Sequence, residues 1–427
     1  MKRFIETHTS PFRLLVVQAS LVGVLTGLVW VIFAGAIDLI TRWREIIVSQ
    51  GPIFPVRVVI ATLVSGTMVT VAMILCRSFA RETLGGGIAF MEGVLDGFFS
   101  IRPKRILGVK GVSSLLILAS GMPLGPEGPI IQMGGAIGAL ISKIYRVSAD
   151  RGKILAASGI GAAMAAAFNA PLGGILVVME EFRPEFENRI EAWHSVIFSV
   201  VGATIVGRLI SGTAPVFSVE RFATPSFYSL WIFALLGILL GIVGYWFNRL
   251  FFWFSDLFSK LPWSAVILGC FIGALTVLTP VLTGDGFDVV TWAFNNHQRG
   301  WILLLIFAAR FLLTILCGST GAPGGLYMPL LALATIFSLG FAREMHFFFP
   351  GFLPHPEILA IAGTAALISA TSRTPLAAIV ITVEITDNYE LLLAMIVCSL
   401  FSLVTAEKLG GEPIFSVLLR RSLHRDN

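Results

Sequence analysis

Acidic side chains stand within apolar stretches of this chain, where ionisable groups are rare. Glu127 lies in the segment 125–129 (GPEGP), and the apolar run that follows is expected to form a helix from Pro129 onward. A helix start carries unpaired N–H groups and a partial positive charge, which together bind anions. Glu127 can place its own carboxylate where an anion would bind and swing away when protonated. The structural alternative is a carboxylate that only caps a helix end.

Residues 318–325 are too rich in glycine and proline to be helical, and the break that follows, at 324–329 (GGLYMP), predicts another helix start within an apolar region. The backbone amides of Leu326 and Tyr327 would be exposed there. Two such starts aimed at one point would build a desolvated anion site from backbone dipoles without Arg or Lys, so that an anion could bind and still leave. A plain turn between two spans is the alternative interpretation.

Three consecutive glycines, at 85–87, precede a short apolar segment. Successive backbone N–H groups in such a loop can form an anion-binding nest, to which Gly86 and Gly87 would contribute. A flexible loop without a ligand explains the same residues.

A carboxylate pair, Glu180 and Glu181, ends another apolar segment and is followed by Arg183. A solvated helix end is the simple interpretation. The functional interpretation is that Glu181 takes protons from the aqueous side and passes them inward toward Glu127.

The composition indicates the environment in which these residues lie. Of 427 residues, 56% are hydrophobic and only 13% are charged, and the mean hydropathy is +0.88. So few charges cannot cover a soluble surface, and they also exclude disorder, coiled coils, collagen and nucleic-acid binding. The lipid bilayer is the solvent that suits this chain. The net charge of +5 is typical of basic cytoplasmic loops and ends.

The chain repeats itself at an offset of 204 residues. Within 155–181 and 359–385, nine of 27 positions are identical without a gap, including Glu180 and Glu384. Each copy predicts a helix, a break at 169–171 (NAP) or 373–375 (RTP), and a short apolar helix that ends in glutamate. We therefore expect two halves, about 12–215 and 226–427, which is a transporter architecture. The residues alone leave open whether the repeat is parallel or inverted. The matched Glu180 and Glu384 predict a shared structural role, whereas Glu181 has no acidic counterpart.

Other chemistry is not indicated. The four cysteines lie far apart in apolar runs and predict buried thiols rather than disulfides or metal ligands. The sequence has no HExxH, no GxSxG and no paired aspartates, so we expect neither an enzyme nor a metal site. No signal-peptide cleavage pattern is present, and the compact length favours the inner membrane of a bacterium, with both basic termini in the cytoplasm.

Together these segments resemble the CLC family of chloride channels and chloride/proton antiporters. The segments 125–129, 324–329 and 85–90 are similar to the family's GK/REGP, GxFxP and GSGIP motifs. The segments 169–184 and 386–390 match as well. Order and spacing agree over nearly the whole chain, which makes the ensemble specific although no single segment is.

The resemblance implies an all-α integral membrane protein with one transmembrane domain over residues 1–427, no soluble domain, and an inverted repeat of tilted, broken and re-entrant helices. It also implies a homodimer in which each subunit has its own pathway, with chloride and protons as substrates and no cofactor. Glu127 falls on the external gating glutamate, and Glu181 on the internal proton-transfer glutamate that antiporters have and channels usually lack. The anion-binding set it implies is Gly86, Gly87, Gly128, Leu326, Tyr327 and Phe415.

Some positions that bear on the ion pathway depart from the family pattern. Gly86 replaces the family's central serine, Phe415 its central tyrosine, and Pro126 the basic residue beside the gating glutamate. Two side-chain hydrogen bonds to the ion are therefore missing, each worth about 1.5–3 kcal/mol when the partner is charged. These changes bear on chloride affinity and on coupling more than on the fold.

The sequence thus favours an antiporter that exchanges chloride for protons. A passive or weakly coupled chloride channel of the same fold is the alternative, and Glu181 is the residue that discriminates, since a channel has no use for it. In a third interpretation, the transported anion is fluoride, nitrate or bromide instead of chloride. A membrane enzyme or receptor is a further class, which any measured anion flux would exclude.

Overall fold

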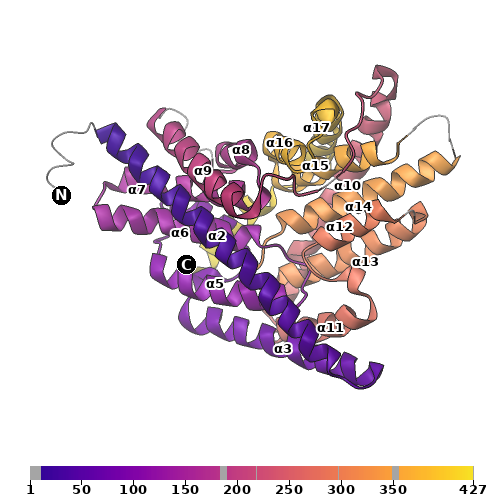
Figure 1. Cartoon of the computed structure of the whole chain (residues 1–427), viewed down its shortest axis with the longest axis horizontal. Helices are drawn as coiled ribbons and strands as arrows, with labels where there is room; N and C mark the ends of the chain where they lie inside the picture. The colour runs from indigo at the N-terminus through magenta and orange to yellow at the C-terminus, as the bar shows by residue number, and fades with distance from the viewer. Residues whose placement is uncertain (1–10, 183–189, 218, 297, 349–354, 427) are drawn as a thin grey trace.

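The computed structural model describes residues 11–182, 190–217, 219–296, 298–348 and 355–426. Within these residues the chain forms seventeen α-helices and a few short 3₁₀ turns, without a strand (Figure 1). The predicted all-α fold class is confirmed.

The same succession of eight helices occurs twice, and one more helix closes the chain. The first eight are α2 (Pro11–Ser49), α3 (Phe54–Phe79), α4 (Ile88–Leu95), α5 (Pro103–Ala119), α6 (Glu127–Tyr145), α7 (Ala149–Phe168), α8 (Pro171–Glu181) and α9 (Ile190–Ser211). The next eight are α10 (Leu230–Ser259), α11 (Ser264–Leu278), α12 (Phe287–Asn295), α13 (Gly300–Ser319), α14 (Tyr327–Phe348), α15 (Glu357–Ser372), α16 (Pro375–Thr386) and α17 (Leu392–Lys408), followed by α18 (Ile414–Asp426). In Figure 1 the first set lies mostly on the left and the second mostly on the right.

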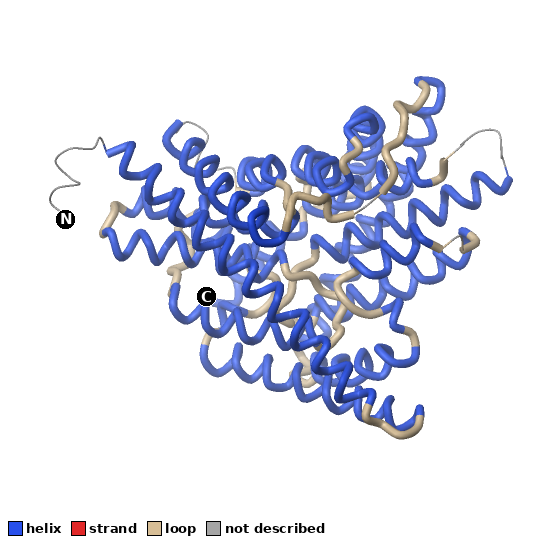
Figure 2. The backbone as a smooth tube through the Cα atoms, viewed as in Figure 1, coloured by secondary structure: helices blue, strands red, loops and turns tan. Residues whose placement is uncertain are grey.

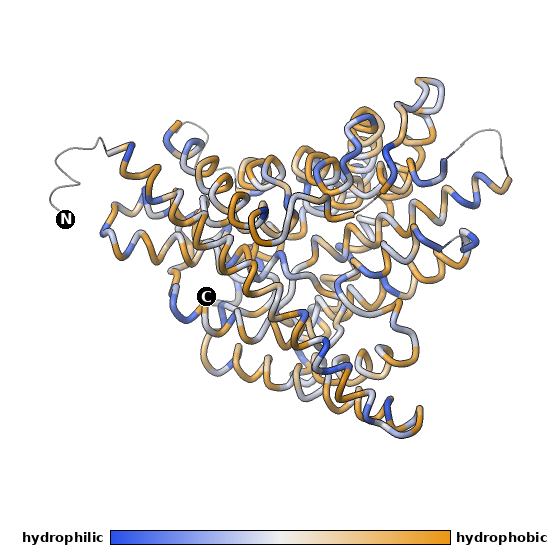
Figure 3. Tube along the Cα trace, in the orientation of Figure 1, coloured by the Kyte–Doolittle hydropathy of each residue, from blue (hydrophilic) through white to orange (hydrophobic). Residues whose placement is uncertain are grey.

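Seven helices among the described residues are long and apolar enough to cross a bilayer. Helix α14 differs from the other six, because 72% of its most apolar window is buried inside the protein, against 33–39% for the rest. The other six therefore present apolar surface to lipid, while α14 lies inside the bundle. Figure 3 shows hydrophobic residues along most of the helix lengths, as a multi-pass membrane protein requires.

Helices α8 and α16 demonstrate that the repeat is inverted. Glu180, near the end of α8, accepts hydrogen bonds from the amides of Leu376 (3.2 Å) and Ala377 (2.7 Å) in the first turn of α16. Glu384, near the end of α16, accepts from the amides of Leu172 (3.1 Å) and Gly173 (2.8 Å) in the first turn of α8. The two helices run antiparallel, and each carboxylate caps the helix of the other half. This contact confirms the structural role predicted for the matched pair.

The predicted breaks between the repeated helices are also confirmed. Asn169 and Arg373 each end a helix in the left-handed region, with φ of 49° and 67°. Pro171 and Pro375 then begin the next helices, where a missing N–H costs nothing. The Arg373 guanidinium donates to the carbonyls of Leu403 and Gly411, which holds this strained turn in place.

Two predicted boundaries are wrong. Helix α6 begins at Glu127 rather than at Pro129, because proline is tolerated throughout a first turn whose N–H groups lack helical partners anyway. Gly318, expected in an irregular segment, lies in the last turn of α13. A side-chain carbon there would stand 2.9 Å from the ring of Phe251, so close packing requires glycine within the helix.

All four cysteines are free thiols. Three of them are buried as predicted, whereas Cys270 is only half-buried. Its Sγ atom fills the space beside Gly66, where a methyl group would stand 2.4 Å away.

Candidate anion site

The three glycine-rich breaks meet in the interior of the protein. Gly125 and Gly325 exchange backbone hydrogen bonds of 2.9 and 2.6 Å, and the amide of Gly85 donates to the carbonyl of Gly321 at 2.8 Å. Figure 2 shows loop segments in the middle of the molecule with helices around them. Irregular backbone at this depth is tolerated where neighbouring backbone satisfies it or where it lines a polar site.

Three helices begin at this meeting point. Helix α4 starts at Ile88, α6 at Glu127 and α14 at Tyr327, each directly after one of the breaks. Gly128 packs so tightly here that a methyl group on it would stand 2.5 Å from the carbonyl oxygen of Gly86. The positive ends of three helix dipoles therefore converge in a site without bulk solvent, which favours a small anion.

The Glu127 side chain occupies this point. The residue is 1% exposed, and neither carboxylate oxygen has a hydrogen bond of ordinary geometry. The amides of Tyr327 and Met328, at the start of α14, lie beside the carboxylate. A negative group thus stands where an anion would bind, and without a strong partner it can be displaced by one or neutralised by a proton.

The remaining residues of the predicted anion-binding set lie around this point in different ways. Gly87 makes the turn before α4, with φ of 95°, and packs against Gln132. Gly86 leaves open space, since a side-chain carbon would stand 3.4 Å from the nearest atom, the carbonyl oxygen of Gly324. Leu326 is 5% exposed in the break before α14. Phe415, in α18, stacks on the ring of Tyr327 with centroids 5.8 Å apart.

Sequence reasoning missed Lys110. This lysine is fully buried in α5, and its ammonium group donates to the carbonyls of Thr83 (3.0 Å) and Gly85 (2.5 Å). It holds the glycine loop before α4 in place. The sequence did contain a signal for Lys110, namely an ionisable residue in the apolar part of a helix. Such a residue is a functional candidate by default within a membrane.

Glu181 belongs to a different group of residues from Glu127. It ends α8, and its Oε2 atom is shielded from solvent and lacks a hydrogen-bond partner. Glu92 and Glu180 are close enough to act on it electrostatically, and so is Tyr327. Arg183, the predicted neighbour of this pair, lies outside the described residues. The structure therefore separates a carboxyl at the anion point from a carboxyl at the end of α8.

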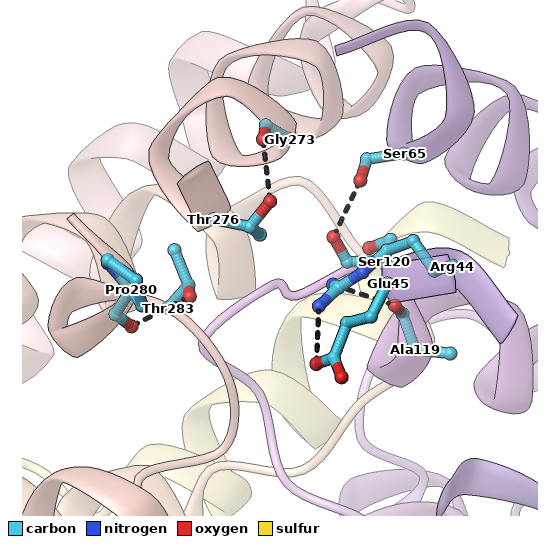
Figure 4. A network of polar contacts seen from close by, with 9 residues as sticks. All are labelled: Arg44, Glu45, Ser65, Ala119, Ser120, Gly273, Thr276, Pro280 and Thr283. Atoms are coloured by element: carbon cyan, nitrogen blue, oxygen red, sulfur yellow. Dashed lines mark hydrogen bonds and ion pairs between the residues drawn. The ribbon is translucent and has the colours of Figure 1, made fainter. Parts of the chain in front are cut away.

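A polar network holds the break that leads to Glu127 (Figure 4). Arg44 from α2 donates to the carbonyl of Ala119 at 2.9 Å, and Ser65 from α3 donates to that of Ser120 at 2.9 Å. These carbonyls end α5, where helical partners are absent. The first two long helices thus position the segment from which α6 begins.

Comparisons with known proteins find similar sequences and structures over nearly the whole chain. The sequence model of the family described as voltage gated chloride channel matches residues 66–407. The H(+)/Cl(-) exchange transporter ClcA of Vibrio cholerae is 40% identical over 99% of this chain and 92% of its own length. The protein of the same name from Vibrio campbellii is 38% identical over 100% of this chain and 93% of its own. The crystal structure of a slow cyanobacterial Cl⁻/H⁺ antiporter is 41% identical, with a TM-score of 0.93, and the match covers 97% of this chain and 99% of that one.

Proposed function

The chain belongs to the voltage gated chloride channel family, and we propose that Glu127 is its gate and proton acceptor and Glu181 its internal proton donor. The observation that carries this proposal is the buried Glu127 carboxylate beside the amides of α14, at the meeting point of three helix starts. Chloride would displace the charged side chain from the backbone amides of α14. A protonated side chain would leave the site to the anion, so that one group couples the two ions.

The chain is a secondary active transporter that exchanges chloride for protons. Its relatives named as exchangers are 35–40% identical over 99–100% of the chain, which favours exchange over a passive channel. We propose that Glu181 makes the difference, because a buried carboxyl at the end of α8 is needed for proton entry and has no use in a channel. Backbone amides and water would take the place of the hydroxyls absent at Gly86 and Phe415.

Proton movement in liposomes tests these roles. Purified protein is reconstituted, and an imposed chloride gradient is the only driving force. Wild-type protein should move protons uphill, and both Glu127→Ala and Glu181→Gln should abolish that movement while chloride flux continues. Uphill proton movement that survives either substitution would refute the role assigned to that residue.

We further propose a homodimer in the inner membrane of a bacterium, as the family resemblance implies. Each chain contains a complete set of helix starts and both carboxyls, so each subunit would carry its own pathway. Light scattering in detergent should give twice the chain mass of 46.1 kDa after correction for bound detergent. A single chain mass would refute the dimer and leave the transport proposal intact.

A further inference from the structure

The hydroxyl group of Tyr327 has no function in the site described above. The residue serves that site through its backbone amide, yet its side chain is 1% exposed and its oxygen lacks a hydrogen bond of ordinary geometry. A buried hydroxyl without a partner is costly, and phenylalanine would avoid the cost. The family motif has phenylalanine at this position and tyrosine at 415, whereas this chain has Tyr327 and Phe415. The hydroxyl has therefore moved from one ring of a stacked pair to the other.

The Tyr327 hydroxyl lies beside a pair of hydroxyls at the junction of α15 and α16. Ser372 and Thr374 are hydrogen-bonded to each other at 2.7 Å, and both lie near the tyrosine oxygen. Ser372 donates its proton to the carbonyl of Ile368 at 2.9 Å, so Thr374 is the donor within the pair. The Thr374 oxygen consequently keeps lone pairs that can accept a proton from Tyr327 or from a water between them.

Tyr327 also spans the interval between the two carboxyls. Its amide lies beside the Glu127 carboxylate at the start of α14. Glu181 is near enough to act electrostatically on the Tyr327 hydroxyl, and its Oε2 atom also lacks a hydrogen-bond partner. Two shielded oxygens without hydrogen-bond partners thus lie within electrostatic range of each other, and proton passage between them needs a hydroxyl or a water.

We propose that the Tyr327 hydroxyl relays protons between Glu181 and the anion site; the inference rests on the exchange function proposed above. The protonated Glu181 gives its proton to a lone pair of the tyrosine oxygen, directly or through one water. The original hydroxyl proton passes through water at the anion site to the Glu127 carboxylate, so that one O–H bond of the tyrosine breaks as the other forms. Tyrosine ends neutral, and the Glu181 carboxylate regains a proton from the aqueous side. Thr374 and Ser372 orient the hydroxyl between transfers.

The variant Tyr327→Phe tests the relay. It removes one unpartnered oxygen and leaves ring and backbone in place, so folding should be retained. We expect the number of protons moved per chloride to fall about tenfold, which corresponds to about 1.4 kcal/mol on the barrier to proton transfer. The matched control is Tyr245→Phe, whose hydroxyl accepts an exposed hydrogen bond from Arg249 at 2.5 Å within α10. This control should keep the wild-type ratio.

Other outcomes separate the proposals. An unchanged proton-to-chloride ratio in Tyr327→Phe overturns the relay. A weaker chloride affinity, measured by calorimetry, with an unchanged ratio also overturns it, because the hydroxyl would then serve the anion. If wild-type protein moves chloride without any protons in the same assay, the exchange function itself fails, and this is seen before any substitution is made.

Discussion

A methyl group on Gly325 would stand 2.2 Å from the Oε1 atom of Glu127, so the glutamate fills the space that a side chain at 325 would need. The same methyl group would stand 2.6 Å from the amide nitrogen of Gly128. Glycine at 325 is thus required by the close approach of two helix starts rather than by backbone conformation, since its φ lies outside the left-handed region. The close packing of the two halves and the position of the Glu127 carboxylate are therefore one structural feature.

The first prediction concerns this contact. Gly325→Ala should displace the Glu127 carboxylate and push α6 from α14, and coupled transport should fall about a hundredfold, as a 1 Å misplacement at a site can cause. Chloride efflux from liposomes measures the effect. Gly108→Ala, on the exposed side of α5 with no atom near the added carbon, should transport at the wild-type rate. Equal transport rates in the two variants would show that the close approach of Gly325 to the Glu127 carboxylate does not matter for transport.

A second prediction concerns the missing serine hydroxyl. Gly86→Ser has room for its side chain, because the added carbon meets nothing closer than 3.4 Å. The new hydroxyl should tighten chloride binding about 10- to 150-fold, which is the effect of one hydrogen bond of about 1.5–3 kcal/mol to a charged partner. Calorimetric titration with chloride measures the affinity. Gly86→Ala fits equally well but lacks the donor, so a gain in that variant as well would show that the hydroxyl is not the cause.

Lys110 provides a third prediction. Lys110→Met should leave the carbonyls of Thr83 and Gly85 unpaired, which costs about 1–3 kcal/mol for each buried acceptor. The variant should unfold at a lower temperature and bind chloride more weakly, because the glycine loop before α4 loses the hydrogen bonds that hold it. Thermal unfolding in detergent and chloride titration are the measurements. Lys104→Met, at the exposed start of the same helix, should change stability by less than about 0.5 kcal/mol.

The reciprocal caps provide a fourth prediction. Glu180→Ala and Glu384→Ala each remove a carboxylate that accepts two amide hydrogen bonds at a helix start. Each should cost about 1–2 kcal/mol, as the loss of other N-terminal caps does, and the two losses should be similar because the contacts are related by the repeat. Thermal unfolding compares them with the exposed control Glu220→Ala. A large effect in only one variant would show that the two caps are not equivalent.

Much of the fold was predictable because the bilayer restricts the possibilities. Apolar runs must become helices, since unpaired backbone groups are not tolerated in lipid, and the matched Pro171 and Pro375 mark where the repeated helices restart. The helix start at Glu127 was placed two residues late because proline is equally acceptable at several positions of a first turn. Local propensity does not distinguish these positions.

Part of the candidate site was also visible in the residues. Glu127 stood out as a charge between glycines and prolines at membrane depth, and Glu181 as an acid without a counterpart in the repeat. Lys110 was overlooked, because a charge in an apolar helix indicates burial without indicating which groups it binds. Its partners, Thr83 and Gly85, lie about 25 residues earlier in the chain.

The sequence by itself determined that the chain lies in a bilayer, that it contains a repeat, and that its helices break at glycines and prolines. Those properties follow from composition and from local backbone chemistry. Only the tertiary structure decided that α8 and α16 run antiparallel, that Gly125 bonds to Gly325, and that the Tyr327 ring stacks on Phe415. Such contacts join residues 88 to 212 positions apart, and no local rule of spacing brings them together. They arise because the two halves can bury their broken helix ends only against each other.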